Sequence, residues 1–300
     1  MPEKASPTHK SEEPARLDLN ATELTMQILV INLDRSPERL AHFTAEANRV
    51  GVQFDRISAV DGRELSEAEV QEQTDPAFEF KPLNRAEFGL FVSHRLAWQR
   101  LLESSEKNAA IFEDDVLLAD NLAAVFSAID ALDQEFDVIK LETTFRSIVL
   151  NKEGLPLCED TRLHPLLTWH GGTAGYVVSR RGAQRLLERK QRVSDPIDQV
   201  LFNPMSRVSQ DLSVLQVVPA VCVQNDILAR VHGRGSDFGS TIQQRRRWGQ
   251  IFRYGPATDL RRLWTKVKER RRRKHLANVA GNQDVVVGYQ GLKNESNTCQ

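Results

Sequence analysis

The chain has 300 residues and a formal net charge of −1, with 40% hydrophobic and 27% charged residues. These are the proportions of an ordinary globular protein, long enough to bury a sizeable core in one large or two small domains. The three cysteines (Cys158, Cys222 and Cys299) are too few and too scattered for a disulfide framework and lack the spacing of a zinc site, which indicates a reducing compartment.

Two further exclusions concern targeting. No apolar run approaches the roughly 20 residues that a membrane-spanning helix needs. Residues 1–25 lack the apolar core of a secretory signal and are expected to form a polar, disordered arm. We therefore expect a protein that is made and kept in the cytoplasm.

The chain after this arm begins with a strand, a helix and a second strand. QILVINL (27–33) predicts a buried strand, and Ser36-Pro37 predicts the start of a helix that Gly51 ends. FDRISAV (54–60) predicts the second strand, closed by a turn at Asp61-Gly62. Such a unit favours an α/β fold with a parallel sheet.

Alternating helices and strands continue to residue 243. The periodicity predicts a strand pair or one bent strand over 214–224, and loop or irregular structure over 74–84 and 146–168. We expect one nucleotide-binding α/β domain over 26–243. Its other helices are expected over 64–73, 86–106, 121–133 and 180–191, and its other strands over 109–112, 136–142 and 172–179.

The stretch AAIFEDDVLL (109–118) places three adjacent carboxylates, Glu113, Asp114 and Asp115, at the end of an apolar strand. Ligands of open α/β sheets lie beyond the carboxyl ends of strands. Clustered carboxylates there suit Mg²⁺ or Mn²⁺, which would relieve their mutual repulsion and bridge to phosphate oxygens. The alternative is a loop whose charges face water.

Four blocks of this sequence resemble glycosyltransferase family 25. They follow the family's order: ILVINLDRSPERL (28–40) with FDRISAVDG (54–62), FGLFVSHRLAWQRLL (88–102), AAIFEDDVLL, and GGTAGYVVSRRGAQRLL (171–187) with PIDQVLF (196–202). The resemblance implies a GT-A-like fold, a nucleotide-sugar donor, commonly UDP-galactose, and a divalent metal. It implies Asp115 as metal ligand, with Glu113 or Asp114 positioning the metal or the donor ribose.

The turn after the first strand offers four polar residues for the donor, Asn32, Asp34, Arg35 and Arg39. Backbone N–H groups at a helix start attract anions, and arginine forks suit phosphates or the uracil edge. For Arg39 the alternative is a solvated helix face. Asp61 is a candidate contact for uracil or ribose, or a plain turn residue.

Further donor contacts are implied by the resemblance. Ser93 and His94 belong to a family block, which favours the donor pocket, although a histidine on an apolar helix face is also typical of a packed core. Gly172, within GGTAG (171–175), would let the backbone approach a sugar closely. Tyr176 would stack on that sugar or fill core.

An inverting transferase needs a carboxylate base for the acceptor hydroxyl. Asp198 matches an acid of the family pattern and is the first candidate, with Asp195 and Glu142 as alternatives; as a structural residue, Asp198 would cap a helix. A late His232 or Asp237 would complete the metal site, unless residues 229–241 form only a surface loop.

The segment 244–300 is strongly basic. Residues 245–275 hold thirteen Lys/Arg and two Asp/Glu, so the remaining chain carries −12. Leu260, Leu263, Trp264 and Val267 recur at helical spacing among these charges, which is typical of an interfacial membrane helix. The alternative is a basic helix that docks on the acidic body. Nucleic-acid binding is disfavoured, because that body would repel phosphate.

These observations favour a metal-dependent inverting hexosyltransferase. It would use Mn²⁺ or Mg²⁺ and move galactose from UDP-galactose to a saccharide or lipid-linked saccharide of lipopolysaccharide type. We expect it in the cytoplasm, peripherally associated with the anionic surface of the inner membrane. The alternative is a non-catalytic adaptor that binds a sugar nucleotide at that surface.

Overall fold

The computed structural model describes residues 26–189, 192–233 and 256–293. An eight-stranded mixed sheet forms its centre, in the order β2-β1-β3-β9-β5-β10-β8-β7. The strands are β1 (Gln27–Asn32), β2 (Asp55–Ser58), β3 (Asn108–Glu113), β5 (Val138–Lys140), β7 (Leu155–Cys158), β8 (Thr161–Pro165), β9 (Gly175–Ser179) and β10 (Val214–Val218).

The sheet confirms the α/β class, and the predicted parallel arrangement holds for its first three strands but not for the rest. Strands β1, β2 and β3 are parallel to one another, whereas β9 runs antiparallel between β3 and β5. Strand β10 is parallel to β5 and antiparallel to β8, and β7 pairs antiparallel with β8. The apolar runs revealed the strands but not their directions, because a buried run has the same composition either way.

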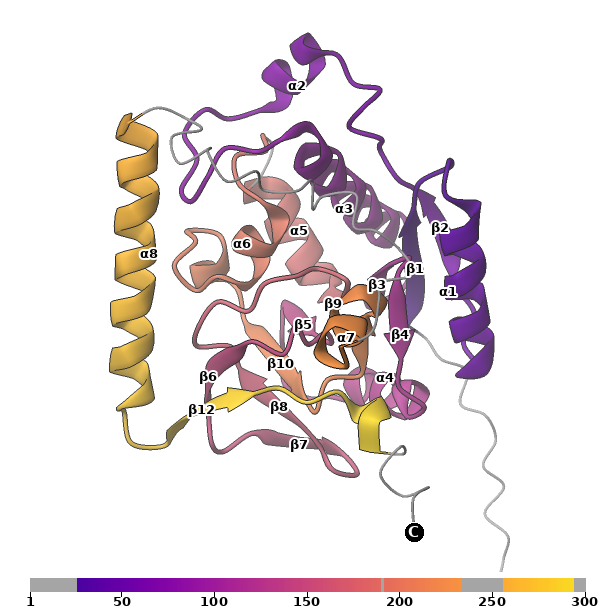
Figure 1. The fold of residues 1–300 in the computed structure, drawn as a ribbon. Coiled ribbons are helices and arrows are strands. Elements are labelled where there is room, and N and C mark those ends of the chain that lie inside the picture. Colours follow the sequence, from indigo (N-terminus) through magenta and orange to yellow (C-terminus); the bar gives the residue numbers. More distant parts are fainter. Residues whose placement is uncertain (1–25, 190–191, 234–255, 294–300) are drawn as a thin grey trace, which may run out of the picture.

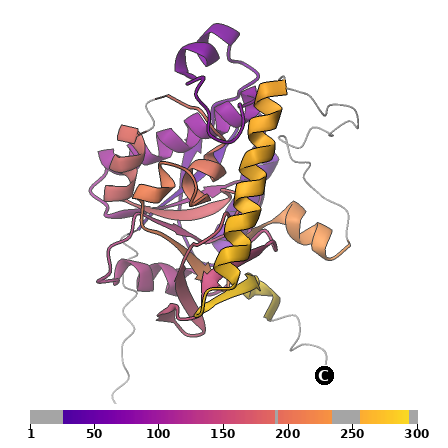
Figure 2. The same cartoon turned by 90° about the vertical axis from the view of Figure 1, so that its left-hand side faces the viewer.

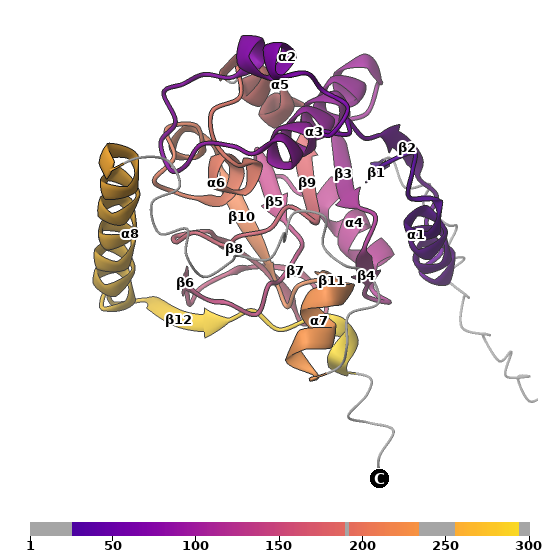
Figure 3. The same ribbon diagram turned by 45° about the horizontal axis from the view of Figure 1, so that its top comes forward.

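Helices cover both faces of this sheet (Figure 1 and Figure 3). Side chains alternate along β1: Ile28 and Val30 face one core, and Leu29 and Ile31 face the other. The first core is completed by α1 (Pro37–Arg49) and α4 (Leu122–Asp130), and the second by α3 (Arg85–Glu103), α5 (Arg180–Arg189) and α6 (Ile197–Phe202).

Local signals fix where several helices begin and end. Pro37 is the first residue of α1, as predicted, and Gly51 follows the helix with a φ of +73°. Helix α3 begins with a capping box in which the side chains of Asn84 and Glu87 each accept a backbone N–H of the other residue. A second capping box starts α2 (Glu67–Gln73), and a 3-10 turn occupies Ser209–Asp211.

The segment 146–168 was expected to be irregular, and this is wrong. It contains β6 (Ser147–Asn151), β7 and β8. Strand β6 pairs with β12 (Asn282–Val286), more than 130 residues away in the sequence. Over 214–224 a strand pair is confirmed: β10 is followed by β11 (Cys222–Gln224), which pairs with β4 (Val116–Leu118).

The last described segment, 256–293, packs on the body. Helix α8 (Pro256–Ala277) leads into β12, and a 3-10 turn over Gln290–Lys293 ends the described chain. Thr143 Oγ1 donates to the Val287 carbonyl at 2.6 Å, and Ala220 N donates to the Gly288 carbonyl at 2.8 Å. Figure 2 shows α8 along the outside of the molecule. Residues 282–290 are therefore joined to the domain expected over 26–243. None of the helices in the described ranges is long and apolar enough to cross a membrane.

Candidate active site

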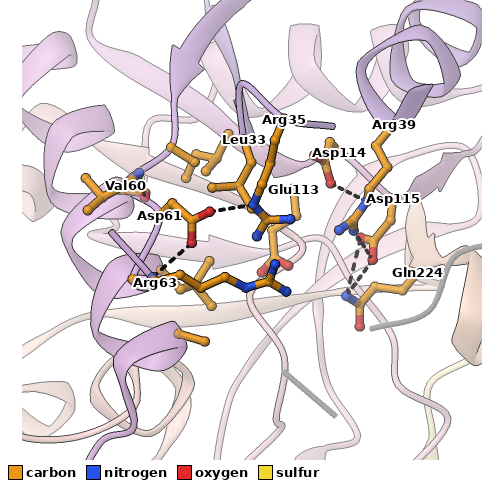
Figure 4. A pocket seen from close by; sticks show the side chains of 16 residues that line it. Leu33, Arg35, Arg39, Val60, Asp61, Arg63, Glu113, Asp114, Asp115 and Gln224 are labelled. Atoms are coloured by element: carbon orange, nitrogen blue, oxygen red, sulfur yellow. Dashed lines mark hydrogen bonds and ion pairs between the residues drawn. The ribbon is translucent and has the colours of Figure 1, made fainter. Parts of the chain in front are cut away.

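Two clefts lie side by side at the carboxyl ends of the central strands. We call them the first and the second cleft; Gln224, at the end of β11, lines both. The first cleft is lined chiefly by the turns after β1, β2 and β3 and by α3 (Figure 4). Its polar lining residues are Arg35, Arg39, Asp61, Arg63, Ser93, Glu113, Asp114, Asp115 and Gln224.

The acidic triplet after β3 is tied to the turn after β1. Arg39, on α1, forms ion pairs with Asp114 (Nε–Oδ1, 2.9 Å) and with Asp115 (Nη2–Oδ2, 2.6 Å). Asn32 donates its side-chain amide to Asp114 Oδ2 at 2.7 Å. Both strands end at the same edge because β1 and β3 are parallel neighbours. The structure thus brings together side chains more than 70 residues apart in the sequence.

The triplet is poorly solvated. Burial and the neighbouring Asp115 raise the pKa of Glu113 to about 8. The Thr173 hydroxyl donates to Glu113 Oε1 at 2.7 Å, which opposes this rise. Burial also raises the pKa values of Asp114 and Asp115, and Arg39 opposes both shifts. Gln224 lies 3.4 Å from Asp115 Oδ1, at the long limit of a hydrogen bond. The cleft therefore gathers three carboxyl groups where water is scarce.

This donor set suits a divalent cation shared with a diphosphate. Mg²⁺ is usually held by one or two carboxylates together with substrate phosphates and water. Among the described residues, no three His, Cys, Asp or Glu side chains gather closely enough to hold a metal alone. The carboxylates of Glu113 and Asp115 repel each other, and a cation there would relieve this. The residues therefore fit a metal ion whose remaining ligands would come from the substrate and water.

The opposite wall of the first cleft carries a second ion pair. Arg35 Nε donates to Asp61 Oδ2, and the Arg63 backbone N–H donates to Asp61 Oδ1 at 3.0 Å. Gly62 lets α3 approach this turn, because a Cβ there would lie 1.9 Å from the Arg85 carbonyl. Ser93 accepts the Val60 backbone N–H at 2.8 Å. The wall is therefore fixed by backbone contacts and leaves the Arg35 and Asp61 side chains to face the cleft.

The second cleft surrounds Asp198, in the first turn of α6. Asp198 lies beside the Gly171-Gly172 backbone: a Cβ added at Gly171 would stand 3.4 Å from Asp198 Oδ2. Burial raises the pKa of Asp198, and the positive charges of Lys140 and Lys81 oppose this. The lining residues are Thr144, Arg146, Trp169, Gly171, Gly172, Asp198, Gln224, Ile227, Arg230 and Val231.

A buried lysine stabilises the glycine segment of this cleft. Lys140 is 0% exposed; its ammonium donates to the Gly172 carbonyl at 2.6 Å and to Glu142 Oε2 at 2.9 Å, and it lies 4.2 Å from the centroid of the Phe202 ring. Gly172 has a φ of +88°, and a Cβ there would lie 2.5 Å from Glu142 Oε1. Only glycine fits this position without displacement.

The alternative bases occupy structural positions. Asp195 is 1% exposed and accepts the backbone N–H groups of Glu79, Phe80 and Lys81 at 2.6–3.3 Å. Glu142 is 0% exposed and paired with Lys140. Of the three candidates, Asp198 is the one that lines a cleft.

Four predicted donor contacts lie elsewhere. Asp34 is exposed and binds Arg56 and Ser58 outside the first cleft. Asn32 donates to Asp114 and to the Ser36 carbonyl, and it lines neither cleft. His94 and Tyr176 are 0% exposed, hydrogen-bonded to each other at 2.9 Å. His94 and Tyr176 are therefore packed core residues, the alternative that the sequence left open, because α3 buries the face that carries His94.

Of the two late candidates for the metal site, His232 and Asp237, neither is among the described residues that line the clefts. His232 is exposed at the carboxyl end of α7 (Asn225–Val231). Asp237 lies outside the described residues. Arg63, Gln224, Lys140, Trp169, Arg146 and Arg230 were not predicted for either cleft. Of these, Lys140 alone carried a signal, as a charged residue inside an apolar strand.

Comparison with known proteins agrees with this architecture. The family model "Glycosyltransferase family 25 (LPS biosynthesis protein)" matches residues 25–201. The chain is 32% identical over 274 residues to the lacto-N-neotetraose biosynthesis glycosyltransferase LgtB of Neisseria gonorrhoeae, covering 84% of this chain and 97% of that protein. It is 29% identical over 239 residues to LgtE of the same organism, covering 76% and 84%.

Among solved structures, the galactosyltransferase LgtC in complex with donor and acceptor sugar analogues has a TM-score of 0.33 and 13% identity, covering 66% of this chain and 86% of that chain. At this TM-score the two folds are only distantly similar. The sequence similarity is much stronger, and the range matched by the family model, residues 25–201, spans the β1 turn and the acidic triplet. The chain belongs to glycosyltransferase family 25.

Proposed function

We propose that the protein is a metal-dependent, inverting galactosyltransferase that uses UDP-galactose and acts on a saccharide of the lipopolysaccharide type. The observation that carries this proposal is the pairing of the two clefts: a charged cleft suited to a nucleotide diphosphate adjoins one lined by a carboxylate, Asp198, which the backbone N–H groups of Gln199 and Gly172 hold in place. The names of the relatives LgtB and LgtE support the acceptor class.

The reaction divides between the clefts. An acceptor hydroxyl in the second cleft attacks the anomeric carbon of the donor sugar, and its proton passes to the Asp198 carboxylate. The bond between the anomeric carbon and the β-phosphate oxygen breaks, and the nucleoside diphosphate leaves with the electron pair. Attack from the face opposite the leaving group inverts the anomeric configuration. Arg35 and Arg39 line the first cleft, where guanidinium groups would bind the diphosphate.

Mn²⁺ or Mg²⁺ is part of this proposal. Asp115, with Glu113, would hold the ion, and when bound it would neutralise charge on the departing diphosphate. Arg39 already neutralises Asp114 and Asp115 in part, which lets the triplet remain folded without metal. His232 is a candidate further ligand from the end of α7.

A nucleotide-sugar panel tests the donor. Purified protein would be mixed with Mn²⁺ and, separately, the uridine-diphosphate derivatives of galactose, glucose, N-acetylglucosamine and glucuronate, and released UDP measured. We expect release from UDP-galactose to exceed the others and to stop with a chelator. Tight donor binding without release or transfer would instead support the non-catalytic adaptor.

We further propose that α8 associates with an anionic membrane surface from the cytoplasm. Leu260, Leu263 and Trp264 are 56–58% exposed, although they are large and apolar. The opposite side of α8 is already bound: Glu269 accepts from Asn203 at 2.6 Å, and Arg273 pairs with Asp284 at 2.8 Å. A helix that packs one face and leaves an apolar, basic face outward is suited to an interface.

Vesicle co-sedimentation tests this surface. The triple variant Leu260→Ser, Leu263→Ser, Trp264→Ser should bind anionic vesicles less than wild type does, and binding should weaken between 0.1 M and 1 M salt as the Debye length falls from about 10 Å to about 3 Å. Substitution is preferable to truncation because β12 pairs with β6. Equal sedimentation of both proteins would contradict the proposal.

A further inference from the structure

We propose that the second cleft is the acceptor subsite, that Trp169 is its sugar platform, and that Arg146 and Arg230 select saccharides carrying a negatively charged substituent. This inference rests on the proposed transferase function and assigns its acceptor class. The three side chains come from the loops around β6 and β9 and from α7, and all line the cleft that contains Asp198.

The indole and the carboxylate flank one small space. A Cβ added at Gly171 would lie 3.1 Å from Trp169 Cζ2 and 3.4 Å from Asp198 Oδ2. Both groups therefore border the side of Gly171 where a side chain would otherwise project. A pyranose ring has an apolar face of C–H groups that packs on aromatic rings, and its rim carries hydroxyls. Packed on Trp169, it would present a hydroxyl to Asp198.

Two polar atoms of this cleft lack partners. Trp169 Nε1 and Thr144 Oγ1 are buried, and neither has a hydrogen-bond partner in the described part of the chain. Buried polar groups are nearly always paired, so an unpaired indole N–H and hydroxyl beside one cleft point to a ligand with hydrogen-bonding groups. The hydroxyls of a saccharide provide both donors and acceptors.

The arginines of the second cleft differ from those of the first. Arg35 and Arg39 are paired with Asp61 and with the triplet, whereas no described carboxylate pairs with Arg146 or Arg230. The Arg146 guanidinium lies over the Trp169 ring, 5.9 Å from its centroid, at the long limit of a cation–π contact.

Arg230 is exposed in the same cleft and donates Nε to the Asp226 carbonyl at 2.9 Å, leaving the ends of its fork available. With the single negative charge of Asp198, the lining is net positive. Guanidinium forks match the oxygens of phosphate and carboxylate groups. An acceptor with such a group near its reacting hydroxyl would therefore be favoured over its neutral counterpart.

The test uses matched acceptor pairs. Octyl glycosides of glucose, galactose and N-acetylglucosamine would be compared with their 6-phosphate and uronate counterparts, at saturating UDP-galactose and Mn²⁺, by transfer and by donor hydrolysis without acceptor. In wild type we expect at least one anionic acceptor to exceed its neutral partner about tenfold in kcat/KM. In the double variant Arg146→Gln, Arg230→Gln, this advantage should fall below about twofold.

Three further variants locate the platform. Trp169→Ala should raise the acceptor KM about tenfold or more, while Trp169→Phe retains most binding. Gly171→Ala adds a methyl group in the space beside Trp169 and Asp198 and should also raise the acceptor KM. Arg189→Gln, on the surface of α5 and paired with Asp211, is the charge-matched control and should leave both readouts unchanged.

Several results would overturn the inference. They are equal use of neutral and anionic acceptors by wild type, a loss of donor binding in place of acceptor selectivity in the double variant, and donor hydrolysis without transfer to any acceptor of the panel. The failure of the proposed function has a different signature, because wild type would then neither hydrolyse nor transfer from any nucleotide sugar.

Discussion

The two clefts are built from opposite kinds of sequence. The first is assembled from short, contiguous blocks at the ends of neighbouring parallel strands, and its charged groups are largely paired with one another. The second gathers residues from 144 to 231, and two of its buried polar atoms have no partner in the described chain. The paired charges hold the first cleft in shape before a ligand binds, whereas the unpaired groups of the second cleft are available to a ligand.

This contrast agrees with the proposed division between a donor cleft and an acceptor cleft. Substitutions in each cleft should therefore have different effects.

The largest effect is expected for Asp115→Asn in the first cleft. Loss of one hard ligand should reduce transfer about 10³-fold, equivalent to about 4 kcal/mol of leaving-group stabilisation. The fold should persist, because the variant removes a charge from a repelling pair. Transfer at limiting Mn²⁺ and circular dichroism measure this. Asp120→Asn, exposed near the same strands, is the control. Near-normal turnover at limiting Mn²⁺ would contradict the metal assignment.

In the second cleft, Asp198→Asn should reduce kcat by about 10²- to 10³-fold, because a base acts in the transition state. The matched comparison is Asp195→Asn. It should lower stability by about 1–3 kcal/mol, since its carboxylate accepts three backbone N–H groups, and alter kcat only indirectly. Urea unfolding and initial rates distinguish the two. An unchanged kcat in Asp198→Asn would transfer the role to another acid.

A smaller effect is expected at the buried lysine. In the double variant Lys140→Met, Glu142→Gln, no buried charge is left unpaired, but the cation that lowers the pKa of Asp198 is gone. The acidic limb of the kcat profile should therefore move to higher pH, with kcat reduced about tenfold near neutrality. The nearby charges of Lys81 and Glu269 remain. A profile that falls uniformly without shifting would indicate a purely structural role.

The smallest effect concerns stability and lies behind both clefts. Burial lowers the pKa of His94 to about 3, and burial with the charge of Lys140 lowers that of His170 to about 3. Below pH 6.5 the unfolded chain binds protons that these two histidines exclude in the folded protein, so their contribution to the free energy of unfolding falls as pH decreases from about 6.5 towards 3. Glu113, whose pKa burial raises to about 8, contributes in the opposite direction, because the folded protein holds a proton there that the unfolded chain has lost. Each histidine should contribute about 2 kcal/mol between pH 7.5 and pH 5.

Urea titrations at the two pH values measure this slope. His94→Asn should change the difference in stability between the two pH values by about 2 kcal/mol relative to wild type, and His275→Gln, on the exposed side of α8, should leave it unchanged. An identical slope in His94→Asn and wild type would show that His94 accepts a proton in the folded protein.

The first half of the fold was predictable because its signals are local. The β-branched run of β1, the Ser36-Pro37 start of α1 and the Gly51 stop each act over a few residues. Strand β6 could not be predicted, since its partner β12 lies at the other end of the chain. The antiparallel direction of β9 was missed for the same reason: strand order is a property of the assembled sheet.

The sites divide in the same way. Arg35, Arg39 and the acidic triplet were each proposed for the donor site from local signals, a strand-to-helix turn and a charged strand end, and they line one cleft. Trp169, Arg146 and Arg230 each stand alone in an unremarkable local sequence, and tertiary packing brings them together. His94 was placed in the donor pocket because it lies in a family block, although its neighbours on α3 are apolar and it packs in the core.

The most direct test of the two-cleft account is calorimetric titration of UDP-galactose, with Mn²⁺, into Asp115→Asn and Asp198→Asn. The account predicts that donor affinity falls at least about tenfold in the first variant and stays within about twofold of wild type in the second. Equal loss in both, or loss in Asp198→Asn alone, would contradict it, because the donor would then depend on the cleft assigned to the acceptor.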